Sequence, residues 1–118
     1  MCMSQVTLAK DLSCLIREWR LTTGELLSFF GHADMSDENL MTTIADASGE
    51  ELEYFHRLVI IRELVHALYP ESHWAQCPRH PNRYFNQRSL IKVIEENPLS
   101  GSKEVHTYLM GSIHGGFL

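Results

Sequence analysis

The chain has 118 residues, of which 44% are hydrophobic and 21% are charged, and its formal net charge is −5. This length suits one globular domain, and this composition argues against a wholly disordered chain or a coiled coil. The negative net charge is the wrong sign for a domain whose whole surface attracts nucleic acid.

Apolar residues spaced by three and four positions predict helices from the N-terminal region onward. The first stripe covers residues 8–19. Residues 22–25 have the S/T-x-x-E pattern of a capping box and open a short second helix, which Gly31 is placed to end. Ser36 suits the N-cap of a third helix.

A second capping box at residues 48–51 opens the longest predicted helix, which Pro70 closes. The piece from 71 to 76 can form one or two helical turns. Pro78 and Pro81 then mark a loop, because proline removes a hydrogen-bond donor and restricts the residue before it.

Two more helices are predicted near the C-terminus. One begins between residues 87 and 89 and ends at Asn97-Pro98, and the other is capped by Ser100 or Ser102 and stopped by Gly115-Gly116. No strand pair with hairpin chemistry and no internal repeat occurs. The expected fold is therefore all-α, a compact multi-helix single domain over residues 1–118.

The two short helices at residues 21–31 and 36–47 make a degenerate helix-turn-helix conceivable, although plain helical packing explains them as well. The third helix carries Asp37, Glu38 and Asp46 and no Lys or Arg. These carboxylates would repel DNA phosphates over a Debye length of about 10 Å. We expect this helix to be a poor reader of DNA.

The cysteines at positions 2, 14 and 77 are odd in number and lack C-x-x-C spacing, which favours a reducing compartment. No apolar run approaches the roughly 18 residues of a membrane span or resembles a signal peptide. We therefore expect a cytoplasmic protein without a membrane partner.

His73, Cys77 and His80 could bring imidazole and thiolate ligands together at a zinc ion. Pro78 and Pro81 interrupt any helix that would align them, however, and the spacing matches no common zinc motif. No motif for nucleophilic, metal-hydrolase or nucleotide-binding chemistry occurs. We predict a chain that is not an enzyme and uses no metal or cofactor, with a metal-binding or small enzyme domain as an alternative.

The segment from residue 79 to 92 carries four cations and no acid. Its cations and interleaved aromatic residues are Arg79, Arg83, Tyr84, Phe85, Arg88 and Lys92. The segment can bind an anionic partner, either nucleic acid or an acidic protein face. A solvated loop that its two aromatic side chains anchor to the core explains the same residues. We predict these six residues as partner contacts.

At the C-terminus, Phe117 and Leu118 follow a diglycine. They either fold back onto the last helix or project into a pocket of a partner, and we include both among the predicted partner contacts. Trp74 is expected to be a core anchor between the longest helix and the helix that begins near residue 89. Its indole N–H would donate to a carbonyl of the proline-rich loop.

The order of motifs in the second half of the chain is distinctive. A helix over residues 56–69 is followed by Trp74, by Pro81-Asn82, by the turn F-N-Q-R-S-L at residues 85–90, and by Tyr108-Leu109. This order resembles the toxin-binding domain of the Xre/MbcA/ParS antitoxin family.

The chain departs from the family pattern at three places. The family has glycine where Asn86 stands and proline where Ser89 stands, but Asn tolerates the left-handed conformation and Ser can start a helix. The interval from Trp74 to Pro81 is also longer than the usual one, so the alignment of residues 75–80 is open.

The resemblance implies an Xre-like helical region over residues 1–50, which can bind operator DNA, and a toxin-binding-like region over residues 51–118. The toxin of this family is often an NAD-consuming enzyme of the RES type, and the terminal segment of family members blocks its active site. We predict an antitoxin-like module that masks a protein partner stoichiometrically, expected as a homodimer. The alternative is a dimeric DNA-binding regulator of its own operon.

Overall fold

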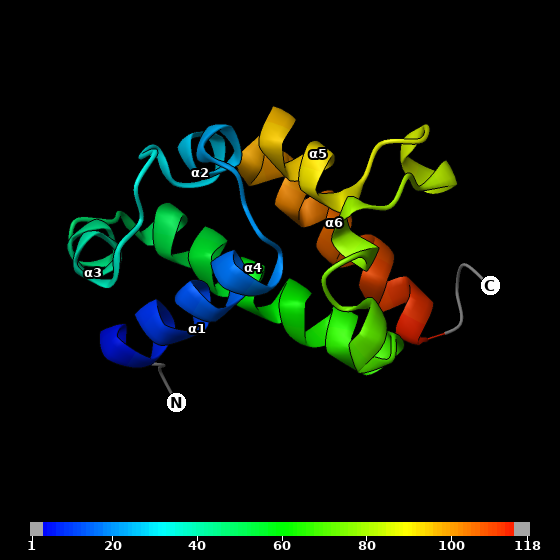
Figure 1. Cartoon of the computed structure of the whole chain (residues 1–118), viewed down its shortest axis with the longest axis horizontal. Coiled ribbons are helices and arrows are strands. Elements are labelled where there is room, and N and C mark those ends of the chain that lie inside the picture. The colour runs from blue at the N-terminus through cyan, green and yellow to red at the C-terminus, as the bar shows by residue number, and fades with distance from the viewer. Residues whose placement is uncertain (1–3, 115–118) are drawn as a thin grey trace.

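The computed structural model describes residues 4–114, which fold into helices without β-strands (Figure 1). The α-helices are α1 (Gln5–Glu18), α2 (Thr23–Phe30), α3 (Asp37–Ala45), α4 (Gly49–Leu68), α5 (Leu90–Glu96) and α6 (Pro98–Ile113). Short 3-10 helices lie between α4 and α5, and they are η1 (Glu71–His73), η2 (Cys77–Arg79) and η3 (Arg83–Phe85). The predicted all-α fold is confirmed. Among the described helices, none is both long and apolar enough to cross a bilayer.

The predicted capping boxes are present at the starts of α2 and α4. The Thr22 and Ser48 side chains each accept the backbone N–H three residues later, and Glu25 and Glu51 accept the N–H of the capping residue in return. Gly31 ends α2 with a φ of 80°, the left-handed conformation that glycine adopts without steric cost. Local side-chain chemistry therefore sets these helix boundaries.

The last helix begins earlier than predicted, at Pro98 rather than after Ser100 or Ser102. Asn97 is its N-cap and accepts the N–H of Ser100 at 3.4 Å. Proline suits the first helical position, where its missing N–H would have no intrahelical partner. Ser102 is instead fully buried, and its hydroxyl donates to the carbonyl of Leu99 at 3.0 Å.

The long helix α4 forms the axis of the fold, with α1 packed against it on one side and α6 on another (Figure 1). The short helix α3 packs mainly on α1, whereas α2 packs on α5. In a helix-turn-helix the two helices form one unit. Because α2 and α3 have different main packing partners, the structure favours plain helical packing for the N-terminal half.

One hydrophobic core joins the residues before and after position 50. It includes Leu12 and Trp19 of the N-terminal region together with Leu58, Ile94 and Leu109 of the C-terminal region, all of which have no exposed surface. The two regions named in the sequence prediction therefore share a core within the described residues.

Trp74 is half-buried, which corrects its expected role as a core anchor between α4 and α5. Its ring stacks on His66 of α4, with centroids 3.6 Å apart and planes 8° apart. The indole N–H donates to the carbonyl of Tyr69, the C-cap of α4, and not to a carbonyl of the proline-rich loop as predicted. The single 3-10 turn η1 keeps Trp74 next to the end of α4. The fully buried tryptophan is Trp19, which caps the C-terminus of α1.

Candidate functional site

The connection between α4 and α5 holds most of the residues predicted to contact a partner. Its prolines break the chain into 3-10 turns because each removes a backbone donor. Its last part is a closed loop, in which Asn82 and Arg88 form an isolated antiparallel bridge. Asn86 and Gln87 turn the chain with φ of 57° and 69°. Asn86 thus adopts the left-handed conformation, which asparagine tolerates.

Arg79 binds groups within the fold rather than extending into solvent. Its Nη1 and Nη2 donate to the Glu25 carboxylate at 2.9 and 2.6 Å. Its Nε donates to the carbonyl of Trp19 at 3.0 Å, and Nη2 also reaches the carbonyl of Arg20 at 2.7 Å. The bidentate pair with Arg79 lowers the pKa of Glu25 below its ordinary value, and the pKa of Arg79 is raised in return. Arg79 therefore clamps η2 to the turn between α1 and α2.

Three further predicted contacts also have partners inside the domain. Phe85 is only 4% exposed and belongs to the core. Arg88 pairs with Glu96 and donates through Nε to the carbonyl of Phe85. Lys92 lies 3.5 Å from the carboxylate of Glu95, one helical turn along α5. The expected anchoring of this loop to the core is thus supplied by Phe85.

Arg83 and Tyr84 lie on the outside of the loop. The Tyr84 side chain is 52% exposed, and its ring centroid lies 4.8 Å from that of Tyr108 on α6 and 4.9 Å from that of Phe85. The side chain of Asn82 accepts the backbone N–H of Tyr84 at 2.8 Å. These contacts hold Tyr84 in position, so its exposed edge has little conformational entropy to lose on binding.

A groove of about 450 Å³ runs between this loop and α6. Its lining residues are Tyr84, Phe85, Asn86, Arg88, Lys103, Glu104 and Thr107. We refer to the groove together with Arg83 as the η3–α6 surface. Lys103 and Thr107 were not among the residues predicted to contact a partner, although their spacing of four residues places both on one face of α6.

Phe117 and Leu118, the remaining predicted contacts, lie outside the described residues. Their assignment stays a prediction.

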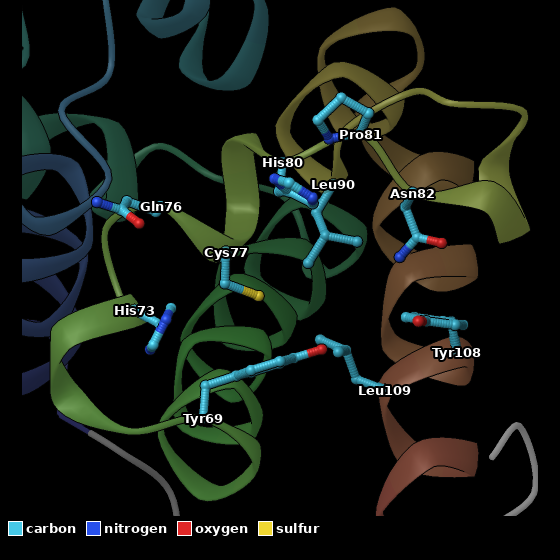
Figure 2. Close-up of a pocket in the computed structure, with 10 residues that line it drawn as sticks. All are labelled: Tyr69, His73, Gln76, Cys77, His80, Pro81, Asn82, Leu90, Tyr108 and Leu109. Atoms are coloured by element: carbon cyan, nitrogen blue, oxygen red, sulfur yellow. The ribbon is translucent and has the colours of Figure 1, made fainter.

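His73, Cys77 and His80 line a second cavity, at the C-terminal end of α4 (Figure 2). Within residues 4–114, no group of three His, Cys, Asp or Glu side chains is arranged to hold a metal ion. Burial raises the pKa of the Cys77 thiol to about 11, and burial likewise raises the pKa of Tyr69, which lines the same cavity, to about 12. Both groups are therefore neutral near pH 7, and Cys77 lacks the thiolate form that nucleophilic attack requires.

The first turn of α3 presents Asp37 and Glu38 on the surface. Carboxylates near a helix N-terminus stabilise the helix through its dipole. The same carboxylates offset the positive end of the dipole that would otherwise attract a DNA phosphate. The acidic turn is thus explained by helix stability.

Comparison of the chain with protein-family models, with curated proteins and with solved structures finds no match in any of the three. The resemblance to the antitoxin family therefore rests on the motifs in the chain itself.

Proposed function

We propose that this chain is an antitoxin-like protein-binding module, which masks a partner protein stoichiometrically and without turnover. The observation that carries the proposal is the presentation of Tyr84. Its half-exposed ring packs against the rings of Phe85 and Tyr108 and lines the groove. Tyrosine and arginine are the residue types that most often dominate protein interfaces, because they contribute large contact areas and polar ends.

The charge of the η3–α6 surface indicates the kind of partner. Lys103 and Arg88 line the groove and Arg83 lies next to it. Because Glu96 neutralises Arg88, Arg83 and Lys103 remain against one acid, Glu104. Arg83 and Lys103 form no ion pair with a carboxylate among the described residues. On a chain of net charge −5, this local excess of cations fits an acidic face of a partner. The family resemblance points to a toxin, such as an enzyme of the RES type.

The test is co-expression with the product of the neighbouring gene, followed by growth measurement and purification of the complex. We expect the two chains to co-purify at a fixed ratio and the partner to be inhibited only when this chain is present in at least equal amount. Tyr84→Ala should raise the Kd by about 30-fold or more, as a hot-spot truncation does. Leu27→Ala is the matched control, since Leu27 is 55% exposed on α2 and lies outside the surface.

A charge reversal tests the acidic partner face separately. Arg83→Glu should weaken binding more than Lys10→Glu, a reversal on the exposed side of α1, and the difference should shrink as salt is raised.

Two outcomes would contradict the proposal. Equal effects of Tyr84→Ala and Leu27→Ala on the Kd would place the interface elsewhere. Inhibition of the partner by a small fraction of an equivalent of this chain would refute stoichiometric masking.

A further inference from the structure

A cavity of about 380 Å³ lies between the end of α4, the η1–η2 segment and α6 (Figure 2). Its lining residues are Tyr69, His73, Gln76, Cys77, His80, Pro81, Asn82, Leu90, Tyr108 and Leu109. The volume falls within the range of about 300–1,000 Å³ typical of small-molecule sites. We propose that this cavity binds an uncharged, planar heteroaromatic molecule of one or two rings.

The walls of the cavity favour a flat apolar body. The Tyr69 side chain extends across the cavity toward Leu109, and Tyr108 faces it from α6 (Figure 2). Leu90 and Leu109 also line the cavity, and their side chains are almost wholly buried. An aromatic ring can stack or pack edge-to-face against tyrosine rings, which adds about 0.5–1.5 kcal/mol per ring pair to the gain from burial.

Polar groups at the edge of the cavity favour a ligand with heteroatoms. The Oδ1 of Asn82 accepts the N–H of Tyr84, so the amide nitrogen of the same side chain remains as a donor toward the cavity (Figure 2). The side chain of Gln76 forms no hydrogen bond with the described residues, and His73 and His80 add ring nitrogens. These groups can donate to and accept from the edge of a heterocycle.

The residues that line the cavity also indicate the charge of the ligand. Of the residues that line the cavity, all of which belong to the described part of the chain, none is Asp, Glu, Lys or Arg. A charged ligand would lose hydration there without a counter-ion, which costs several kcal/mol. The cavity therefore selects uncharged molecules, in contrast to the cationic η3–α6 surface.

The experiment titrates indole into the isotope-labelled full chain and follows amide chemical shifts. Indole-3-carboxylate serves as the charged counterpart. We expect saturable shifts at the Asn82 side-chain amide and at backbone amides around the cavity, with a Kd at or below about 1 mM. The carboxylate should bind at least about tenfold more weakly.

Two pairs of variants locate the binding. Cys77→Leu places a bulkier side chain in the wall of the cavity and should weaken binding, whereas Cys14→Leu, at a half-buried cysteine of α1, should leave binding unchanged. Tyr69→Leu should weaken binding and Tyr69→Phe should retain it, which keeps the test decisive if Cys77→Leu does not fold. The proposal is overturned if indole produces no saturable shifts, if the carboxylate binds as tightly as indole, or if both Cys77→Leu and Tyr69→Leu bind like the parent. No partner protein is needed, so the result is independent of the proposed masking function.

Discussion

Alanine in place of Gly101 should force α5 and α6 apart. Gly101 lies in the second turn of α6, where this helix meets the end of α5. A Cβ atom at this position would lie 2.3 Å from the carbonyl oxygen of Val93, 2.9 Å from the carbonyl carbon of Val93 and 3.1 Å from the Cα of Ile94. All three atoms belong to the backbone, so no side-chain rotation relieves the clash, and the two helices must separate.

The expected cost follows from two opposed terms. Overpacking of a tight contact costs about 1–3 kcal/mol, and a clash with backbone atoms falls at or above the upper end of that range. The higher helix propensity of alanine relative to glycine offsets about 1 kcal/mol of this cost. The free energy of unfolding should therefore fall by about 2 kcal/mol. For a domain of this size, the melting temperature should fall by about 5–10 °C.

Thermal and urea denaturation followed by circular dichroism measure both quantities. Gly24→Ala in α2 is the control, since a Cβ there meets no atom within 4 Å. This control should leave the stability unchanged or raise it by up to about 1 kcal/mol. If Gly101→Ala proves as stable as the parent, the close approach of α5 and α6 is refuted, and with it the geometry of the η3–α6 surface that depends on α6.

Three further predictions concern the Arg79–Glu25 ion pair, the two tryptophans and residues 115–118. Arg79→Met should destabilise the fold by about 1–3 kcal/mol because Glu25 and two carbonyls lose a charged donor. The pKa of Glu25 is held below its ordinary 4.5, so the stability from this pair is present above pH 4.5 and is lost as the pH falls through the lowered pKa. A pH series of urea unfolding should show a smaller acid-dependent loss in Arg79→Met than in the parent. Urea unfolding should also show a loss of about 3–5 kcal/mol for Trp19→Ala and only about 1–2 kcal/mol for Trp74→Ala, and equal losses would contradict the difference in burial. Deletion of residues 115–118 should abolish neutralisation of the partner; a lower melting temperature with intact neutralisation would rule out a partner contact.

Helix starts and stops could be predicted wherever they depend on residues within one turn. The capping boxes at residues 22–25 and 48–51 and the left-handed Gly31 are of this kind, because the donor and acceptor are neighbours in the chain. The Asn97-Pro98 pair is the instructive exception. Proline disfavours helix at the residue before it and suits the first position of a new helix, so the pair both ends α5 and starts α6.

The candidate site could be predicted only in part, since composition shows where cations lie but not which carboxylates they meet. The segment that contains Arg79 and Arg83 was identified as cationic from its residues alone. Packing of η2 against the turn between α1 and α2 then places Arg79 on Glu25, 54 residues earlier in the chain, and leaves Arg83 at the surface.

The amino-acid sequence by itself thus determined most of the helices, the capping boxes of α2 and α4 and the position of the basic aromatic segment, because these depend on neighbouring residues. Only the tertiary structure decided that Trp19 rather than Trp74 is the buried indole, and that Tyr84 rests on Tyr108 beside Lys103. Burial, ion pairing and ring stacking act over a few ångströms between elements that are distant in sequence. Their partners are therefore set by how the helices pack.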